Sequence, residues 1–265
     1  MLVKRHQLKP ERSYFFNNAR MGFSVIGKGK PVILLHGSII SNPWYGFEEE
    51  LAKFYKVYIP YLPGFGSSDA VNGKRHTTDL FADALCTFVN ETKLNDAPVV
   101  ALSLGSVVTV KSAAKGCIKG DLILVGMPGK VRSKKLETAS LIPVWLRHLF
   151  GSTVWARKRI LIPAIQDALG SKSDKKLDEE LLDSMSEIDT RSLVDPDPYN
   201  EIVLKIPMLL PKITNRMTFI YGENDKLIES TKDLISDPII IKNAGHNIFR
   251  SEPDKTLAIL KGILQ

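Results

Sequence analysis

The residues around Ser103 indicate chemistry most directly. An apolar run, 98–102, leads into Ser103, and a helical pattern begins at the next residue, Leu104, with Gly105 following. A strand that turns at once into a helix forces the serine into a strained backbone conformation, which small residues two positions before and after it relieve. The hydroxyl then lies beside helix amides that stabilise negative charge. This arrangement suits a nucleophile, although the motif alone leaves a merely structural serine open.

With Ala101, Ser103 and Gly105 so spaced, the chain resembles the α/β-hydrolase superfamily, and specifically its capped serine esterases. It departs from the commonest pattern in having alanine at the first small position and Ser106 where a second glycine often follows. Alanine is small enough to keep the turn. The resemblance implies an α/β fold with a mostly parallel central sheet, flanked by helices and carrying a helical cap insertion.

The resemblance also implies the partners of the serine, in the order nucleophile, acid, histidine. Asp225 follows the apolar run 217–221 in a Gly-x-x-Asp pattern and would orient the histidine, with Glu223 as the competing acid. His246 lies in a Gly-His turn after the run 239–241 and would be the general base. His6, His76 and His148 fit this position less well.

A third match concerns the oxyanion. His36, Gly37 and Ser38 follow the apolar run 31–35, as the oxyanion loop of the family does. The resemblance assigns the backbone amides of Ser38 and Leu104 to holding the negative charge that exists only in the transition state. We expect His36 to be a structural residue of this loop.

These residues predict a serine hydrolase that cleaves a carboxylic ester or thioester through an acyl-enzyme on Ser103. That reaction requires no metal and no organic cofactor. The alternatives are hydrolysis of a carbon–carbon bond with the same triad, a lyase without an acyl-enzyme, and a non-catalytic ligand-binding protein of this fold.

The elements that must position these side chains follow an alternation of apolar runs and amphipathic stretches, which predicts parallel strands covered by helices. Thr77 or Thr78 could cap the second helix. Strands are expected at 13–16, 23–26, 31–35, 57–60, 98–102, 121–125, 217–221 and 239–241, and helices at 44–55, 77–94, 104–115 and 254–264.

The alternation stops after residue 128, and only helical periodicity interrupted by prolines follows until about residue 212. We therefore expect a core of residues 1–128 and 213–265, interrupted by a helical cap at 129–212. Trp145, Leu146 and Leu149 could line an acyl pocket there, or could equally pack the cap against the core.

The net charge of +7 is concentrated in the predicted cap: residues 130–159 hold eight Lys and Arg against Glu137 alone. Such a surface is either simply solvated or favours an anionic partner, for example an acidic acyl carrier protein that presents the substrate. No nucleic-acid-binding module accompanies the charge, so nucleic acid is not an expected partner.

Composition bears on location. The sequence has no apolar run long enough for a membrane span and no secretory signal at its start. Its two cysteines, Cys86 and Cys117, give no disulfide framework, and we expect free thiols in a reducing compartment. Together these features predict a cytoplasmic protein.

Overall fold

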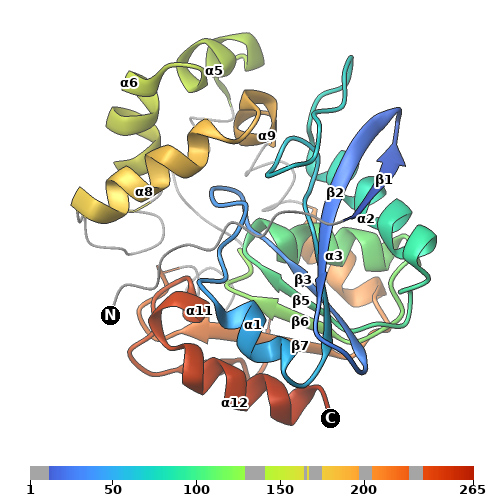
Figure 1. Ribbon diagram of the computed structural model, residues 1–265. Helices are drawn as coiled ribbons and strands as arrows, with labels where there is room; N and C mark the ends of the chain where they lie inside the picture. Colours follow the sequence, from blue (N-terminus) through green and yellow to red (C-terminus); the bar gives the residue numbers. More distant parts are fainter. Residues whose placement is uncertain (1–11, 129–140, 164–165, 167–174, 197–204, 227–234) are drawn as a thin grey trace.

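An eight-stranded sheet forms the centre of the computed structural model, which describes residues 12–128, 141–163, 166, 175–196, 205–226 and 235–265 (Figure 1). The strands lie in the order β1-β2-β4-β3-β5-β6-β7-β8. β2 is antiparallel to β1 and β4, and every pairing from β4 to β8 is parallel. The predicted mostly parallel sheet is therefore confirmed. The strands are β1 (Arg12–Phe16), β2 (Ala19–Ile26), β3 (Pro31–Leu35), β4 (Lys56–Pro60), β5 (Val99–Leu102), β6 (Leu122–Val125), β7 (Met217–Gly222) and β8 (Ile239–Ile241).

Helices cover both faces of the sheet, because its central strands are apolar on both sides. In β3, Ile33 and Leu35 join the core on the face covered by α2 and α3, whereas Val32 and Leu34 join the core under α1, α11 and α12. No helix in the described ranges is long and apolar enough to span a membrane. These helices are α1 (Phe47–Ala52), α2 (Thr78–Thr92), α3 (Leu104–Ala114), α11 (Ile248–Ser251) and α12 (Pro253–Ile263).

Local sequence signals account for these boundaries. α2 begins after Thr77, whose hydroxyl accepts a hydrogen bond from the amide of Leu80 at 3.2 Å. Thr77 is therefore confirmed as the N-terminal capping residue of this helix. Its apolar residues at helical spacing, among them Phe81 and Phe88, are fully buried. The helix ends at Lys93, which adopts the left-handed conformation that often stops a helix.

Every element described between β6 and β7 is helical. The last two pack differently from the others: Ile206 and Leu210 join the core beside α3, so α10 and η3 lie against the sheet layer although they precede residue 213. The remaining five, α5 to α9, are called the insertion helices below. The elements are α5 (Val144–Gly151), α6 (Val154–Ala156), the π-helix η1 (Arg157–Leu161), α8 (Lys175–Ser186), α9 (Thr190–Val194), α10 (Ile206–Leu209) and the 3₁₀ helix η3 (Leu210–Lys212).

α9 holds the insertion helices against the core. The Ser192 hydroxyl donates to the carbonyl of Pro63 at 2.8 Å, and the amide of Asp189 donates to the carbonyl of Gly64 at 2.9 Å. Gly64 permits this approach, since a Cβ atom there would lie 2.2 Å from the Ser192 hydroxyl oxygen. Because Pro63 and Gly64 follow β4, the insertion helices lie at the carboxyl ends of the parallel strands (Figure 1).

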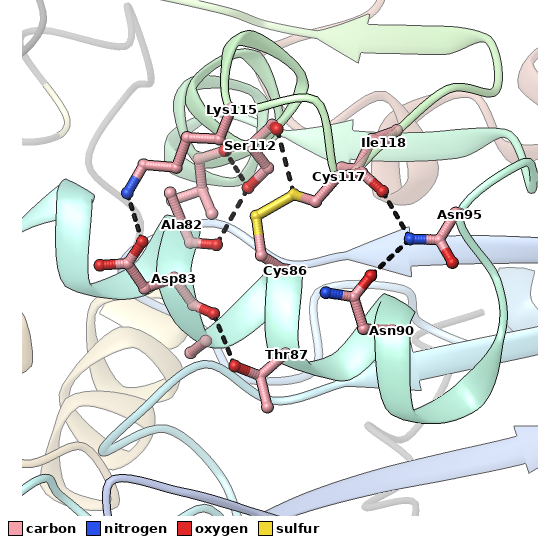
Figure 2. The surroundings of a disulfide bond; sticks show 12 residues. Ala82, Asp83, Cys86, Thr87, Asn90, Asn95, Ser112, Lys115, Cys117 and Ile118 are labelled. Carbon is pink, nitrogen blue, oxygen red and sulfur yellow. Dashed lines mark hydrogen bonds and ion pairs between the residues drawn. A yellow bond between two sulfur atoms is a disulfide. The ribbon is translucent and has the colours of Figure 1, made fainter.

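The two cysteines are joined, so the expectation of free thiols is wrong. Cys86 of α2 and Cys117, in the turn after α3, form a disulfide with their Cα atoms 5.4 Å apart (Figure 2). Their separation of 31 residues gives no sequence signal for pairing, and only the packing of α2 against α3 brings them together. Disulfides are typical of oxidising compartments, so the cysteines no longer support the predicted cytoplasmic location.

Candidate active site

Ser103 occupies the sharp turn between β5 and α3 that the sequence predicts. Its backbone angles, φ 53° and ψ −114°, lie outside the regions that non-glycine residues favour. Its amide donates to the carbonyl of Val125 at 2.8 Å, which continues the pairing of β5 with β6 and fixes the turn. A strained residue over-determined by its neighbours is typical of functional sites.

The small residues around Ser103 have separate structural roles. A Cβ atom on Gly105 would lie 2.5 Å from the carbonyl oxygen of His36, so glycine lets the first turn of α3 pack against the end of β3. Ser106 is buried, and its hydroxyl donates to the carbonyl of Ala101 at 2.7 Å. The serine that departs from the family pattern therefore ties the helix back to the strand.

The loop after β3 passes beside Ser103. A Cβ atom on Gly37 would lie 3.3 Å from the Cβ of Ser103, which brings the neighbouring residue Ser38 close to the serine. Leu104 is the first residue of α3, where backbone amides have no acceptor within the helix. The amides of Ser38 and Leu104 thus belong to two segments that meet at Ser103.

His36 is fully buried and serves the structure of this loop. The Leu62 amide donates to its Nε2 at 3.1 Å, so the ring proton is on Nδ1, which donates to the Gly37 carbonyl at 2.7 Å. Burial lowers the pKa of His36 to about 4, and the ring is neutral at physiological pH. It joins the loop after β3 to the segment after β4.

The loops after β7 and β8 bring Asp225 and His246 together. His246 Nδ1 lies 2.8 Å from Asp225 Oδ2, and the two residues are 8% and 1% exposed. Glu223 instead accepts a hydrogen bond from the amide of Asn243 at 2.9 Å, on the surface. The backbone of Gly222 packs directly against the backbone of Gly245: a Cβ atom on Gly222 would lie 2.2 Å from the Gly245 carbonyl oxygen.

Gly126 connects this pair to Ser103. It follows β6 next to Ser103, because Leu102 pairs with Val125 and parallel neighbours are about 4.8 Å apart. A Cβ atom on Gly126 would lie 2.8 Å from His246 Nδ1 and 3.2 Å from Asp225 Oδ2. The imidazole therefore lies over Gly126, beside the turn that carries the serine, and the three predicted residues share one place at the carboxyl edge of the sheet.

α8 contacts both loops that flank this place. The Tyr45 hydroxyl donates to Glu180 Oε1 at 2.6 Å, and Arg250 Nη2 lies 3.6 Å from Glu180 Oε2. The Arg250 guanidinium also lies over the Tyr45 ring, 5.3 Å from its centroid. Tyr45 follows the loop after β3, which carries Ser38, and Arg250 follows His246, so Glu180 joins the insertion helices to the segments on both sides of the candidate site.

Several residues that the sequence analysis singled out in the insertion helices differ in their exposure. Trp145 and Leu149 are 68% and 58% exposed, and Leu146 is half-buried, so a pocket role for them stays a prediction. Arg157 is buried within the insertion and donates to the carbonyls of Gly151 and Met185 at 2.7 and 2.6 Å. Its charge is therefore part of the insertion's internal structure, not of the solvated basic surface.

Sequence reasoning did not single out Gly126 or Glu180. A glycine directly after a strand was a usable signal for Gly126, whereas the role of Glu180 depends on contacts with distant residues, among them Tyr45, which is 135 positions away. Among the described residues, no group of three or more His, Cys, Asp or Glu side chains is placed to bind a metal ion.

Comparison with known proteins places the chain in a family. The model of the alpha/beta hydrolase family matches residues 32–259, which includes the strands and loops that carry Ser103, Asp225 and His246. The chain belongs to the alpha/beta hydrolase family. Within it, the chain is 24% identical over 250 residues to a 2-succinyl-6-hydroxy-2,4-cyclohexadiene-1-carboxylate synthase of Escherichia coli, covering 89% of this chain and 96% of the relative.

Two solved structures show the same fold. An alpha/beta hydrolase fold protein from Burkholderia ambifaria superimposes with a TM-score of 0.77 at 18% identity, over 97% of this chain and 98% of the other. An N-acyl homoserine lactonase in complex with N-hexanoyl homoserine superimposes with a TM-score of 0.73 at 19% identity, over 96% and 95%. The alpha/beta hydrolase fold is thus preserved along nearly the whole chain.

Proposed function

We propose that this alpha/beta hydrolase is a serine hydrolase that cleaves a carboxylic ester or thioester. Ser103 Oγ attacks the carbonyl carbon while His246 Nε2 accepts the hydroxyl proton, and Asp225 stabilises the resulting imidazolium through Nδ1. The amides of Ser38 and Leu104 hold the oxyanion of the tetrahedral intermediate. The intermediate collapses to an acyl-enzyme as the leaving group takes the proton, and water activated by His246 then releases the acid.

The observation that carries the proposal is the position of the His246–Asp225 pair over Gly126, beside the strained turn at Ser103. With Nδ1 bonded to the carboxylate, the imidazole keeps Nε2 for the serine, which is the tautomer that general-base catalysis needs. The lactonase among the similar structures opens a cyclic ester, so hydrolysis of a carboxylic ester is compatible with this fold.

Labelling with a fluorophosphonate tests the nucleophile. We expect the wild type to label and to hydrolyse p-nitrophenyl esters of graded chain length, and Ser103→Ala to lose both. Ser106→Ala is the control for a neighbouring hydroxyl, because Ser106 is buried and bonded to the Ala101 carbonyl. Labelling that persists in Ser103→Ala would contradict the assignment.

A reaction without an acyl-enzyme, such as that of a lyase, is the second candidate, because the Escherichia coli relative that matches 89% of this chain is named a synthase and not a hydrolase. The compound in that name carries a succinyl group and a carboxylate, so a small anionic substrate would be expected here. Intact-mass measurement during turnover separates the two candidates. Ester hydrolysis passes through an acyl adduct on Ser103, and turnover that never shows this adduct, even under rapid quenching, would favour the lyase.

A further inference from the structure

The outer surface of the insertion helices concentrates exposed apolar side chains. Six of the ten large hydrophobic residues that are exposed among the described residues fall between positions 141 and 155. Isolated exposed hydrophobic residues are ordinary, whereas a concentration of them marks an interaction surface. The name insertion patch is used here for the exposed residues Leu141, Trp145, Leu149, Val154, Trp155, Lys158 and Arg159.

The packing of α5 explains why its part of the patch faces away from the protein. His148 Nε2 lies 2.7 Å from Oδ1 of Asp195, the residue that directly follows α9. A Cβ on Gly151 would lie 2.5 Å from the side chain of Val194, the last residue of α9. At about 100° per residue, His148 and Gly151 share one side of the helix. Trp145 is turned about 90° and Leu149 about 130° away from the middle of that side, and both side chains are left more than half exposed.

The next helical segment repeats this division. Ala156 and Arg157 are buried, and Arg157 is bonded to Met185 at the end of α8. The exposed residues Val154, Trp155, Lys158 and Arg159 follow the spacing i, i+1, i+4 and i+5, which is one face of a helix. Figure 1 shows α5 and α6 at the end of the molecule away from the sheet.

The stretch of chain that carries the insertion patch holds formal charges of one sign. No Asp or Glu occurs from residue 138 to residue 166, whereas Lys158 and Arg159 lie on the exposed face with Trp155. Tryptophan is enriched where apolar and aqueous phases meet, because its ring is amphipathic. Short helices that expose tryptophan and aliphatic side chains together with cations fit an anionic lipid interface, where the apolar groups enter the headgroup boundary and the cations remain among the phosphates.

We propose that the insertion patch docks this protein on the surface of a bilayer that contains anionic lipids. Binding is peripheral: Trp145, Leu149, Val154 and Trp155 insert at the headgroup level, and Lys158 and Arg159 pair with lipid phosphates. The docking rests on the exposure and charge of these residues and does not depend on the chemistry at Ser103. It can therefore be tested in the Ser103→Ala variant as well as in the wild type.

The three tryptophans of the chain make the test direct. Trp44 is fully buried against Phe249, so it reports little on the surface, whereas Trp145 and Trp155 are both more than half exposed. Titration with vesicles of phosphatidylcholine and phosphatidylglycerol should shift tryptophan emission to shorter wavelength. Brominated acyl chains should quench it, and phosphatidylcholine alone should have a smaller effect.

Vesicle sedimentation measures the contribution of each kind of side chain. Lys158→Gln with Arg159→Gln should weaken partitioning to anionic vesicles by about 30-fold, since each cation contributes about fivefold near such a surface. Trp145→Ala with Trp155→Ala should weaken it by about tenfold or more. The matched control for the tryptophans is Phe15→Ala, which removes an aromatic ring on β1, outside the patch, that is 69% exposed. The matched control for the cations is Lys28→Gln with Lys119→Gln, which removes two exposed charges outside the patch.

Two results would overturn the proposal. One is sedimentation with anionic vesicles that is undetectable, or equally strong for the patch variants and their controls. The other is a shift in tryptophan emission that an acidic acyl carrier protein causes and anionic vesicles do not cause, which would identify the partner as a protein. Circular dichroism of each variant distinguishes a lost contact from a lost fold.

Discussion

Ser103 keeps a backbone conformation that costs about 1–3 kcal/mol for a non-glycine residue. Hydrogen bonding to Val125 and the close approach of Gly105 to the end of β3 hold it there. The same contacts place the hydroxyl next to Gly37 and the first amides of α3. The strain and the position of the serine therefore have one cause, which is the immediate passage from a buried strand to a packed helix.

Asp225, and not Glu223, should support the histidine. Asp225→Asn removes the charge that stabilises the imidazolium and supplies a donor where an acceptor is needed, so we expect kcat to fall by about 10³–10⁴-fold. Glu223→Gln is the matched control, since Glu223 contacts the Asn243 amide on the surface, and it should change kcat less than a few-fold. Steady-state hydrolysis of a p-nitrophenyl ester measures both. Comparable losses in the two variants would contradict the assignment.

His36 should make the fold sensitive to acid. Its pKa is about 4 in the folded protein against 6.5 unfolded, so the neutral ring stabilises the fold fully above 6.5. That contribution falls as the pH drops toward 4, with a limit of about 3 kcal/mol. Urea unfolding at several pH values should show a steeper acid loss for the wild type than for His36→Gln. Parallel losses would mean that carboxylates alone cause the acid sensitivity.

α8 is the element that ties the insertion helices to the site. Its Leu181 and Met185 pack with Ile39 and Ile40, directly after Ser38, whose oxyanion role is a prediction, and Glu180 contacts Tyr45 and Arg250. A helix held at several points restricts the loops that it covers. Movement of α8 would therefore displace the loops on both sides of the candidate site.

Removal of the Glu180 carboxylate should loosen this connection. We expect Glu180→Ala to lower kcat/KM by about tenfold, because a small displacement of positioning groups is costly, while the free energy of unfolding falls by only about 1 kcal/mol. Glu179→Ala, an exposed neighbour on the same helix, is the control. A change in stability without a change in kcat/KM would show that the contact is structural only.

At the scale of the whole molecule, the sheet carries one large core on each face, and a covalent link lies in one of these layers. The disulfide joins α2 to the end of α3, the helix that begins at Ser103. Around it, Asn95 donates to the Cys117 carbonyl at 2.9 Å, and Lys115 pairs with Asp83 (Figure 2). The link lies at the far end of α3 from the candidate site.

Reduction should therefore lower stability more than activity. Opening a loop of 31 residues should lower the free energy of unfolding by about 2–4 kcal/mol. Urea unfolding with and without dithiothreitol measures this loss, and Cys86→Ser with Cys117→Ser should show no further response to the reductant. A wild-type unfolding midpoint that does not move with dithiothreitol would contradict a bridge of this stability.

The local part of this fold follows from its sequence. The apolar runs, the Thr77 cap and the small residues around Ser103 act over a few neighbouring positions, so their strands, helices and turns are predictable from the residues alone. The resemblance to the α/β-hydrolase superfamily also predicted Ser103, Asp225 and His246 as candidates, because their motifs follow predicted strands in the order nucleophile, acid, histidine.

Contacts between distant segments could not be predicted in this way. The sequence favoured Asp225 and left Glu223 as a competitor, and the packing of Gly222 against Gly245 is what directs Asp225 to the histidine. The Cys86–Cys117 bond, the burial of Arg157 and the exposure of Trp145 likewise depend on which helices pack together. Burial and pairing are set by the summed packing of elements far apart in the chain, and no local pattern of residues encodes that sum.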